Sequence, residues 1–209
     1  MNDIFNKVIN ELINNEKRII GISGVDTSGK TFFTNTLSRF LTAKNIRNEI
    51  IHIDDFHNPL KIRRQGENDI DAYYNNAFNY SQVISEILEP LRDMGNVDKE
   101  VLCLNLDTDK YENVKRYCID METVLLIEGV LLFRPPIAEY LQGKIFLHIS
   151  FDEVMRRAEI RDVPKYGIEF LDRYKTKYIP IQKRYLREYE PEKNCDIFID
   201  NNDYLNPRL

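Results

Sequence analysis

The chain has 209 residues, of which 43 % are hydrophobic and 30 % charged, and its formal net charge is −5. This length suits one domain with a sizeable core, so we expect residues 1–209 to form a single domain. The acidic balance argues against a nucleic-acid partner and against an anionic membrane surface, because both select basic proteins.

Cysteine usage and the first residues bear on the compartment. Cys103, Cys118 and Cys195 are odd in number and widely spaced, which is typical of thiols in a reducing environment and not of a disulfide framework or metal site. The stretch Met1–Ile4 lacks the basic start of a signal peptide, and no apolar run reaches the length of a membrane span. We therefore expect a cytoplasmic protein.

The first predicted elements frame a glycine-rich loop. Apolar residues at helical spacing predict an amphipathic helix over residues 1–16, and an apolar, β-branched run at 18–22 predicts a buried strand. Residues 24–31 then spell G-x-x-x-x-G-K-T, and residues 31–41 place their large apolar side chains on one helical face. Strand, loop and helix thus follow in the order that a phosphate-binding loop requires.

The residue types of this loop explain its chemistry. Glycines let the backbone turn tightly, so that successive N–H groups face the phosphates of a nucleotide at the start of a helix. Lys30 supplies a positive charge to these phosphates, and the Thr31 hydroxyl is a ligand for Mg²⁺. The residues expected to bind ATP are Gly24, Val25, Asp26, Thr27, Ser28, Gly29, Lys30, Thr31 and Phe32.

The middle of the chain predicts a second strand and a helix separated by a polar segment. The strand at 49–53 ends in Asp54 and Asp55, and residues 56–79 are polar and charged, which predicts an irregular segment lining a site. A helix follows over residues 83–91; it is interrupted late by a proline and closed by a glycine.

The next runs predict a hairpin and two buried strands. Alternating residues at 102–106 and the run 115–119 predict a small antiparallel hairpin attached to the main sheet. The runs 124–127 and 145–149 are almost continuously apolar, as expected of strands buried on both faces. The first of these strands ends in Glu128.

The last part of the chain predicts two helices and a final strand. Residues 151–161 form a charged helix, 162–178 a polar segment, 181–189 a second helix and 195–199 a strand. Strands that alternate with helices in this way predict an α/β fold with a mainly parallel sheet.

Several of these strands carry their chemistry at the carboxyl end, where open α/β sheets bind ligands. Asp54 and Asp55 point to opposite sides if the strand continues, so at most one faces the phosphates. We expect Asp54 to act as the base that activates a hydroxyl. The residues expected to hold Mg²⁺ are Thr31, Asp54 and Glu128.

Arg157 and Arg161 lie four residues apart and therefore share a helical face, which suits a clamp on the transferring phosphate. The alternative is a solvated helix in which Glu159 and Asp162 pair with these arginines, because runs of charge are often only surface.

Taken together, several segments resemble the uridine kinase group within the set that contains phosphoribulokinase and pantothenate kinase. The matching segments are Gly24–Thr31, Asp54–His57, Asn76–Tyr80, Leu126–Gly129, Arg156–Asp162 and Ile199–Asp203. The resemblance covers nearly the whole chain. It implies a P-loop NTPase three-layer sandwich with a small β-hairpin and a helical lid at about 151–170.

The resemblance also implies a reaction: ATP-dependent phosphorylation of the 5′-hydroxyl of a pyrimidine nucleoside, with Asp54 as base and the lid arginines over the phosphates. Relatives often form dimers or tetramers, so a homo-oligomer is compatible with it. The residues expected around the small-molecule substrate are His57, Arg64, Tyr74 and Asn76.

This chain departs from the family pattern on the substrate side. Asn76-Ala77-Phe78-Asn79 stands where members commonly carry Asp-Ala-Phe-Asp, so a carboxylate that accepts from ribose hydroxyls becomes an amide. The hairpin segment Asp107–Tyr111 lacks the histidine that meets the pyrimidine in uridine kinases. His52 and His148 lie within apolar strands, where we expect satisfied core histidines.

Two alternative functions stay open. The first keeps the fold and changes the acceptor to another alcohol, such as a pantothenate-type or sugar-type substrate. The second is a nucleotide-binding regulator without an acceptor; the chain has no Asn-Lys-x-Asp guanine-recognition motif, which weakens its GTPase form.

Overall fold

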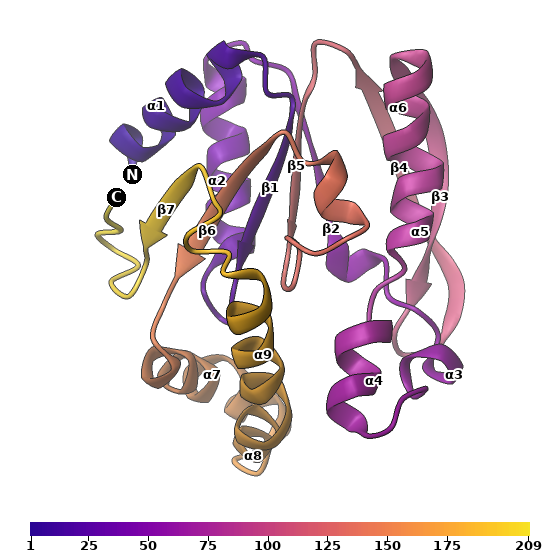
Figure 1. Ribbon diagram of the computed structural model, residues 1–209, viewed down its shortest axis with the longest axis vertical. Coiled ribbons are helices and arrows are strands. Elements are labelled where there is room, and N and C mark those ends of the chain that lie inside the picture. The colour runs from indigo at the N-terminus through magenta and orange to yellow at the C-terminus, as the bar shows by residue number, and fades with distance from the viewer.

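A five-stranded parallel sheet forms the centre of the computed structural model, which describes residues 1–209 (Figure 1). The strand order is β2-β5-β1-β6-β7, and every neighbouring pair is parallel. Their bounds are β1 Ile19–Gly24, β2 Asn48–His52, β5 Val124–Gly129, β6 Gly143–His148 and β7 Ile197–Asp200. All five predicted strands and the parallel α/β architecture are confirmed.

Helices and loops cover both faces of this sheet, which gives three layers. On one face, α1 (Asn2–Glu11) and α2 (Lys30–Ala43) pack against alternate strand residues such as Ile20 and Ile22. The opposite face packs against α5 (Tyr80–Val83), α6 (Glu89–Met94) and α9 (Ile179–Tyr189). Because β1 and β5 are buried along their whole length, their sequences are apolar without alternation.

The predicted hairpin is longer than expected and stands apart from the main sheet. Strands β3 (Asn96–Asn105) and β4 (Lys110–Asp120) form a separate two-stranded antiparallel sheet. Side chains and not ladder hydrogen bonds attach it: Val101 and Tyr117 are buried in the core that also contains α5 and α6. The predicted hairpin is confirmed, but it joins the main sheet through side-chain packing and not through strand pairing.

Helices form in the segment expected to be irregular and in the polar segment that follows the charged helix. The segment 56–79 contains α3 (Leu60–Arg63) and α4 (Asp69–Asn76), and the Asn68 side chain caps α4 by accepting from the Ile70 and Asp71 N–H groups. In the segment 162–178, α7 (Phe151–Tyr166) continues past Arg161, and α8 (Phe170–Arg173) runs through a π-helical turn directly into α9.

Proline explains the interruption predicted in the helix at 83–91. Pro90 sits in the first turn of α6, where its missing N–H costs nothing, and a π-helical turn, Ile84–Leu88, joins α6 to α5. The element closes at Gly95, whose φ of 76° is the left-handed conformation typical of a helix end.

The carboxyl ends of the strands face two groups of helices. In Figure 1, α3 and α4 lie below the sheet on one side and α7 and α8 on the other, with the turn from β1 to α2 between them. A small separate core formed by Val154, Ala158 and Tyr174 joins α7 to α9. None of the helices is both long and apolar enough to cross a membrane.

Gly24, the last residue of β1, gives a test of this packing. A Cβ atom there would lie 2.5 Å from the backbone oxygen of Leu147. We expect Gly24→Ala to lower the free energy of unfolding by about 2 kcal/mol or more, because strand backbone cannot move aside as a side chain can. Urea unfolding measures this loss.

Gly143→Ala is the matched control, because Gly143 also lies in the parallel sheet but its Cβ would meet only side-chain atoms, the nearest at 3.2 Å on Leu12. We expect this variant to lose less than about 1 kcal/mol. Equal losses in the two variants would contradict the packing described here.

Candidate active site

The phosphate loop is held in shape from its outer side. Arg157 Nη1 donates to the Thr27 carbonyl at 3.2 Å, and Asn201 Nδ2 donates to the Ser28 carbonyl at 2.7 Å. Because the peptide group is planar and trans, the N–H of Gly29 points away from this carbonyl, toward the cavity that Gly29, Lys30 and Thr31 line. The first N–H groups of α2 lack intrahelical partners and are free to bind an anion there.

Lys30 lies across the loop. Its Nζ donates to the Val25 carbonyl at 2.9 Å, and the side chain is buried. Burial lowers the pKa of the Lys30 ammonium, while the charges of Asp26, Glu128 and Asp54 oppose that shift. Lys30 lines a cavity of about 360 Å³, and the same three carboxylates line it too.

Glu128 is fixed from two sides at the end of β5. Its Oε1 accepts from the Thr31 hydroxyl at 3.0 Å and from His52 Nδ1 at 2.7 Å, the latter from the neighbouring strand β2. Burial alone would raise the pKa of Glu128, but the His52 hydrogen bond and the Lys30 charge outweigh it and lower the pKa. Glu128 is thus an ionised acceptor beside the Thr31 hydroxyl.

These groups fit a magnesium ion shared with phosphates. Thr31 and Glu128 supply hydroxyl and carboxylate oxygens in contact with each other, and Asp54 lines the same cavity. No group of three or more His, Cys, Asp or Glu side chains forms an all-protein metal cage. Mg²⁺ commonly uses one or two carboxylates plus phosphate oxygens and water, so this donor set suits it. A bound Mg²⁺ would neutralise charge on the phosphates.

Asp54 and Asp55 separate as expected. Asp54 lines the cavity, whereas Asp55 pairs with Lys115 of β4 at 3.1 Å. The two carboxylates follow β2 in a short 3-10 turn, Ile53–Asp55, and point in different directions. Asp54 alone of the two can approach a hydroxyl group in the cavity.

The two lid arginines have different partners, although both line the cavity. The Arg157 guanidinium bonds to Glu153, to Thr27 and to the carbonyls of Asn201 and Asn202, so it braces the loop from behind. Arg161 forms a two-pronged pair with Asp162 at 2.8 and 2.9 Å while its side chain stays half exposed. Clamping of phosphate remains a prediction, and Arg161 is the better placed for it.

A second, more apolar hollow adjoins the phosphate cavity. Its volume is about 320 Å³, and it shares Gly29, Phe32 and Arg157 with that cavity. Phe32, Ile160 and Tyr204 line it with side chains that are each more than half exposed. It offers a flat ring a place beside the loop.

A comparison with family models decides the family. The model of the phosphoribulokinase/uridine kinase family matches residues 19–190. The chain belongs to this family. Members are P-loop kinases that use ATP, so the chain is a nucleotide-binding phosphotransferase.

Relatives agree with this assignment. Nicotinamide riboside kinase 2 of Mus musculus is 28 % identical to this chain. The match extends over 189 residues, which are 88 % of this chain and 87 % of the mouse protein. A possible uridine kinase from Bacillus stearothermophilus shares the fold, with a TM-score of 0.69 and 20 % identity over 94 % of this chain and 95 % of its own. A candidate fructose transport system kinase from Silicibacter sp. also shares the fold. Its TM-score is 0.67, and its identity is 17 % over 94 % of this chain and 97 % of its own.

None of the four expected substrate residues of the kinase lines the phosphate cavity. Tyr74 is buried, with its ring between the guanidinium groups of Arg134 and Arg184 at 4.4 and 4.1 Å. His57 is also buried, and its Nδ1 donates to the Ala77 carbonyl at 3.0 Å. As substrate contacts, Tyr74 and His57 therefore do not fit this structure.

The other two expected substrate residues lie nearer the surface. Arg64 is exposed just after α3, and the Asn76 amide donates to the Gln65 carbonyl at 2.5 Å. Their substrate role remains a prediction. The expectation of core histidines is also wrong, because His52 and His148 are only partly buried and each pairs with a carboxylate, Glu128 or Glu192.

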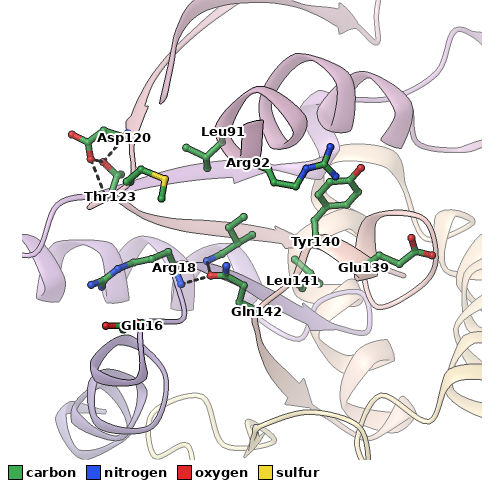
Figure 2. A pocket seen from close by; sticks show the side chains of 12 residues that line it. Glu16, Arg18, Leu91, Arg92, Asp120, Thr123, Glu139, Tyr140, Leu141 and Gln142 are labelled. Atoms are coloured by element: carbon green, nitrogen blue, oxygen red, sulfur yellow. Dashed lines mark hydrogen bonds between the residues drawn. The ribbon is translucent and has the colours of Figure 1, made fainter. Parts of the chain in front are cut away.

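A larger cavity, of about 760 Å³, lies at the opposite edge of the sheet (Figure 2). It surrounds the residues that precede β1, β5 and β6, and Figure 2 shows Gln142 turned toward the backbone of Arg18. The Gln142 Oε1 accepts from the Arg18 and Ile19 N–H groups at 2.6 and 3.0 Å. Gln142 thus connects the start of β6 to the start of β1. No residue of this cavity also lines the phosphate cavity.

Sequence reasoning missed the role of Asn201 in the kinase. Asn201 follows β7 and is buried, and its segment entered only as part of a family resemblance. The available signal was a short polar side chain at the carboxyl end of a predicted strand, the same signal that drew attention to Asp54 and Glu128.

Asn201→Ala tests the outer support of the loop. Removing the amide leaves the buried Ser28 carbonyl without a partner, which costs about 1–3 kcal/mol of stability. We expect ATP to bind about tenfold more weakly, because the Gly29 N–H is no longer held toward the phosphates. Calorimetric titration with ATP and Mg²⁺ measures the affinity.

Asn202→Ala is the control for this variant. The Asn202 side chain bonds to the Ser150 N–H and to Asp200 but not to the loop. We expect a comparable loss of stability with unchanged ATP affinity. If both variants weaken ATP binding equally, Asn201 has no special role in shaping the loop.

Proposed function

We propose that the kinase transfers the γ-phosphoryl group of Mg-ATP to the 5′-hydroxyl of a riboside, with a pyrimidine nucleoside as the first acceptor to test. One observation carries this proposal: Lys30, Thr31, Glu128 and Asp54 converge from different elements on one cavity beside the phosphate loop. Phosphoryl transfer needs a cation cradle, a metal site and a carboxylate near the attacking hydroxyl, and these residues supply all of them.

Each residue has a separate part in this proposal. The N–H groups at the start of α2 and the Lys30 ammonium bind the phosphates, while Thr31 and Glu128 hold Mg²⁺. Asp54 accepts a hydrogen bond from the acceptor hydroxyl, orients it and takes its proton as the new O–P bond forms. The bond from the γ-phosphorus to the oxygen it shares with the β-phosphate breaks, and ADP leaves with that oxygen. Arg161 screens the charge on the transferring group.

The apolar hollow beside the loop is the proposed site for the nucleotide base. Phe32 and Tyr204 offer aromatic faces there, and Ile160 offers an aliphatic one. Because this hollow adjoins the loop on the side of α7, the acceptor has to approach from the other side, toward α4 and α9.

A riboside acceptor is supported by the comparisons. The mouse relative is a kinase of nicotinamide riboside, and the Bacillus stearothermophilus neighbour carries the name of uridine, a second riboside. Both compounds present a primary 5′-hydroxyl on a ribose that also carries two secondary hydroxyls. The base attached to that ribose is the part of the acceptor that differs.

Asp54→Asn tests the base. The amide keeps the shape of the side chain but cannot take a proton, so we expect kcat to fall by about 10²–10⁴-fold. ATP affinity should stay nearly intact, because the phosphates contact the loop and not Asp54. Steady-state kinetics and ATP titration measure the two effects.

Asp55→Asn serves as control, since Asp55 pairs with Lys115 outside the cavity. This variant should keep its turnover. Normal turnover in Asp54→Asn would refute the base assignment.

A panel of acceptors with labelled ATP tests the substrate class. We expect phosphorylation of uridine, cytidine or nicotinamide riboside, and no product from the matching 5′-deoxyriboside. Product from pantothenate or a free sugar alone would replace the riboside with another alcohol. ATP hydrolysis that no acceptor stimulates, together with a stable protein partner, would favour a regulator.

A further inference from the structure

Asp26 is a carboxylate in the phosphate cavity that the proposed reaction leaves without a role. The cavity contains the acids Asp26, Asp54 and Glu128, and the last two serve as base and metal ligand. Asp26 is one of the loop residues expected to bind ATP through the backbone, but the negative charge of its side chain opposes the binding of a triphosphate. The Asp26 side chain is therefore better suited to bind a ligand other than the phosphates of ATP.

The structure holds the Asp26 carboxylate in one orientation. Its Oδ2 accepts from Gln182 Nε2 of α9 at 2.7 Å. Gln182 is buried and its own Oε1 has no hydrogen-bond partner, so the bond to Asp26 fixes the orientation of the amide. The other carboxylate oxygen, Asp26 Oδ1, has no partner within the protein and belongs to a residue that lines the cavity.

Asp26 faces the side from which the acceptor approaches. Tyr73 of α4 and Tyr178, at the end of the π-helical turn before α9, pack edge to face at 5.9 Å. Burial raises the pKa of both phenols, and the charge of Asp26 raises each of them further. Asp26 and Asp54 line the same cavity, and the bond to Gln182 places Asp26 beside α9.

The asparagine side chains of the substrate segment have partners of their own within the protein. The Asn76 amide is turned toward the Gln65 carbonyl, and the Asn79 side chain accepts from the Gln82 N–H as the cap of α5. Asn76 and Asn79 stand where related kinases commonly carry carboxylates. Asp26 is a carboxylate in the same cavity as Asp54 and is able to accept from hydroxyl groups beside the reacting one.

We propose that Asp26, positioned by Gln182, accepts hydrogen bonds from the secondary hydroxyls of the acceptor and makes the kinase selective for a diol. The proposal rests on the proposed riboside kinase activity and adds a specificity-determining residue to it. The ligand class is a small alcohol that carries a primary hydroxyl for Asp54 and a vicinal diol for Asp26.

The test compares a riboside with its 2′-deoxy and 3′-deoxy analogues. In the wild type we expect kcat/KM to fall about 10- to 100-fold when the hydroxyl that meets Asp26 is absent, the range for a hydrogen bond to a charged group. Asp26→Asn and Asp26→Ala should lose a similar factor with the riboside, mainly through the acceptor KM, and should discriminate little between the three compounds.

ATP affinity gives the readout that a merely structural role would not produce. Removing a negative charge from the loop should leave ATP binding unchanged or make it tighter, measured by titration without acceptor. Gln182→Leu should lose part of the diol selectivity, because Asp26 keeps its charge but not its orientation. Asp55→Asn is the matched control and should retain full selectivity.

The outcomes separate this inference from the function on which it rests. If the wild type phosphorylates no riboside, the proposed function fails and the role of Asp26 fails with it. If the wild type phosphorylates ribosides and the Asp26 variants lose activity equally on all three compounds, the diol role alone is overturned. Weaker ATP binding in both Asp26 variants would also overturn it.

Discussion

The direction of a few peptide groups in the phosphate loop is the constraint on which the rest of the site depends. Arg157 from α7 and Asn201 from the end of β7 hold the Thr27 and Ser28 carbonyls on the outer side. The cavity side of the loop thus presents N–H groups and Lys30, together with the Asp26 carboxylate. Two segments distant in the sequence are thus needed to make a short local motif into an anion-binding surface.

Parallel strand pairing assembles the rest of the site. The register of β2, β5 and β1 sets His52 beside Glu128, and Thr31 reaches Glu128 from the first turn of α2. Lys30 lies among three carboxylates, so its positive charge is balanced before any nucleotide arrives. The cavity thus combines a base, metal ligands and a cation, and the phosphates of ATP would supply the remaining ligands of the metal.

Much of the fold and of the phosphate side could be predicted from the sequence. The loop motif, the buried strands and the acids at strand ends are local signals, and Asp54 and Glu128 lie where those signals place them. The acceptor side could not be predicted in the same way, since Tyr74 is buried by arginines far along the chain and His57 by the fold of its own segment against Ala77. The place of His52 could not be predicted either, because the run of apolar residues does not show that β2 is an edge strand beside β5.

The stacking of Tyr74 between Arg134 and Arg184 has a consequence for how an acceptor is received. This one ring joins α4, the loop after β5 and α9, and the ion pair from Arg184 to Asp71 at 2.8 Å reinforces the join. These contacts hold α4, the loop after β5 and α9 in fixed positions relative to one another. We expect the surface that receives the acceptor, between α4 and α9, to be preformed. It would then select acceptors by shape complementarity and not by closing around them.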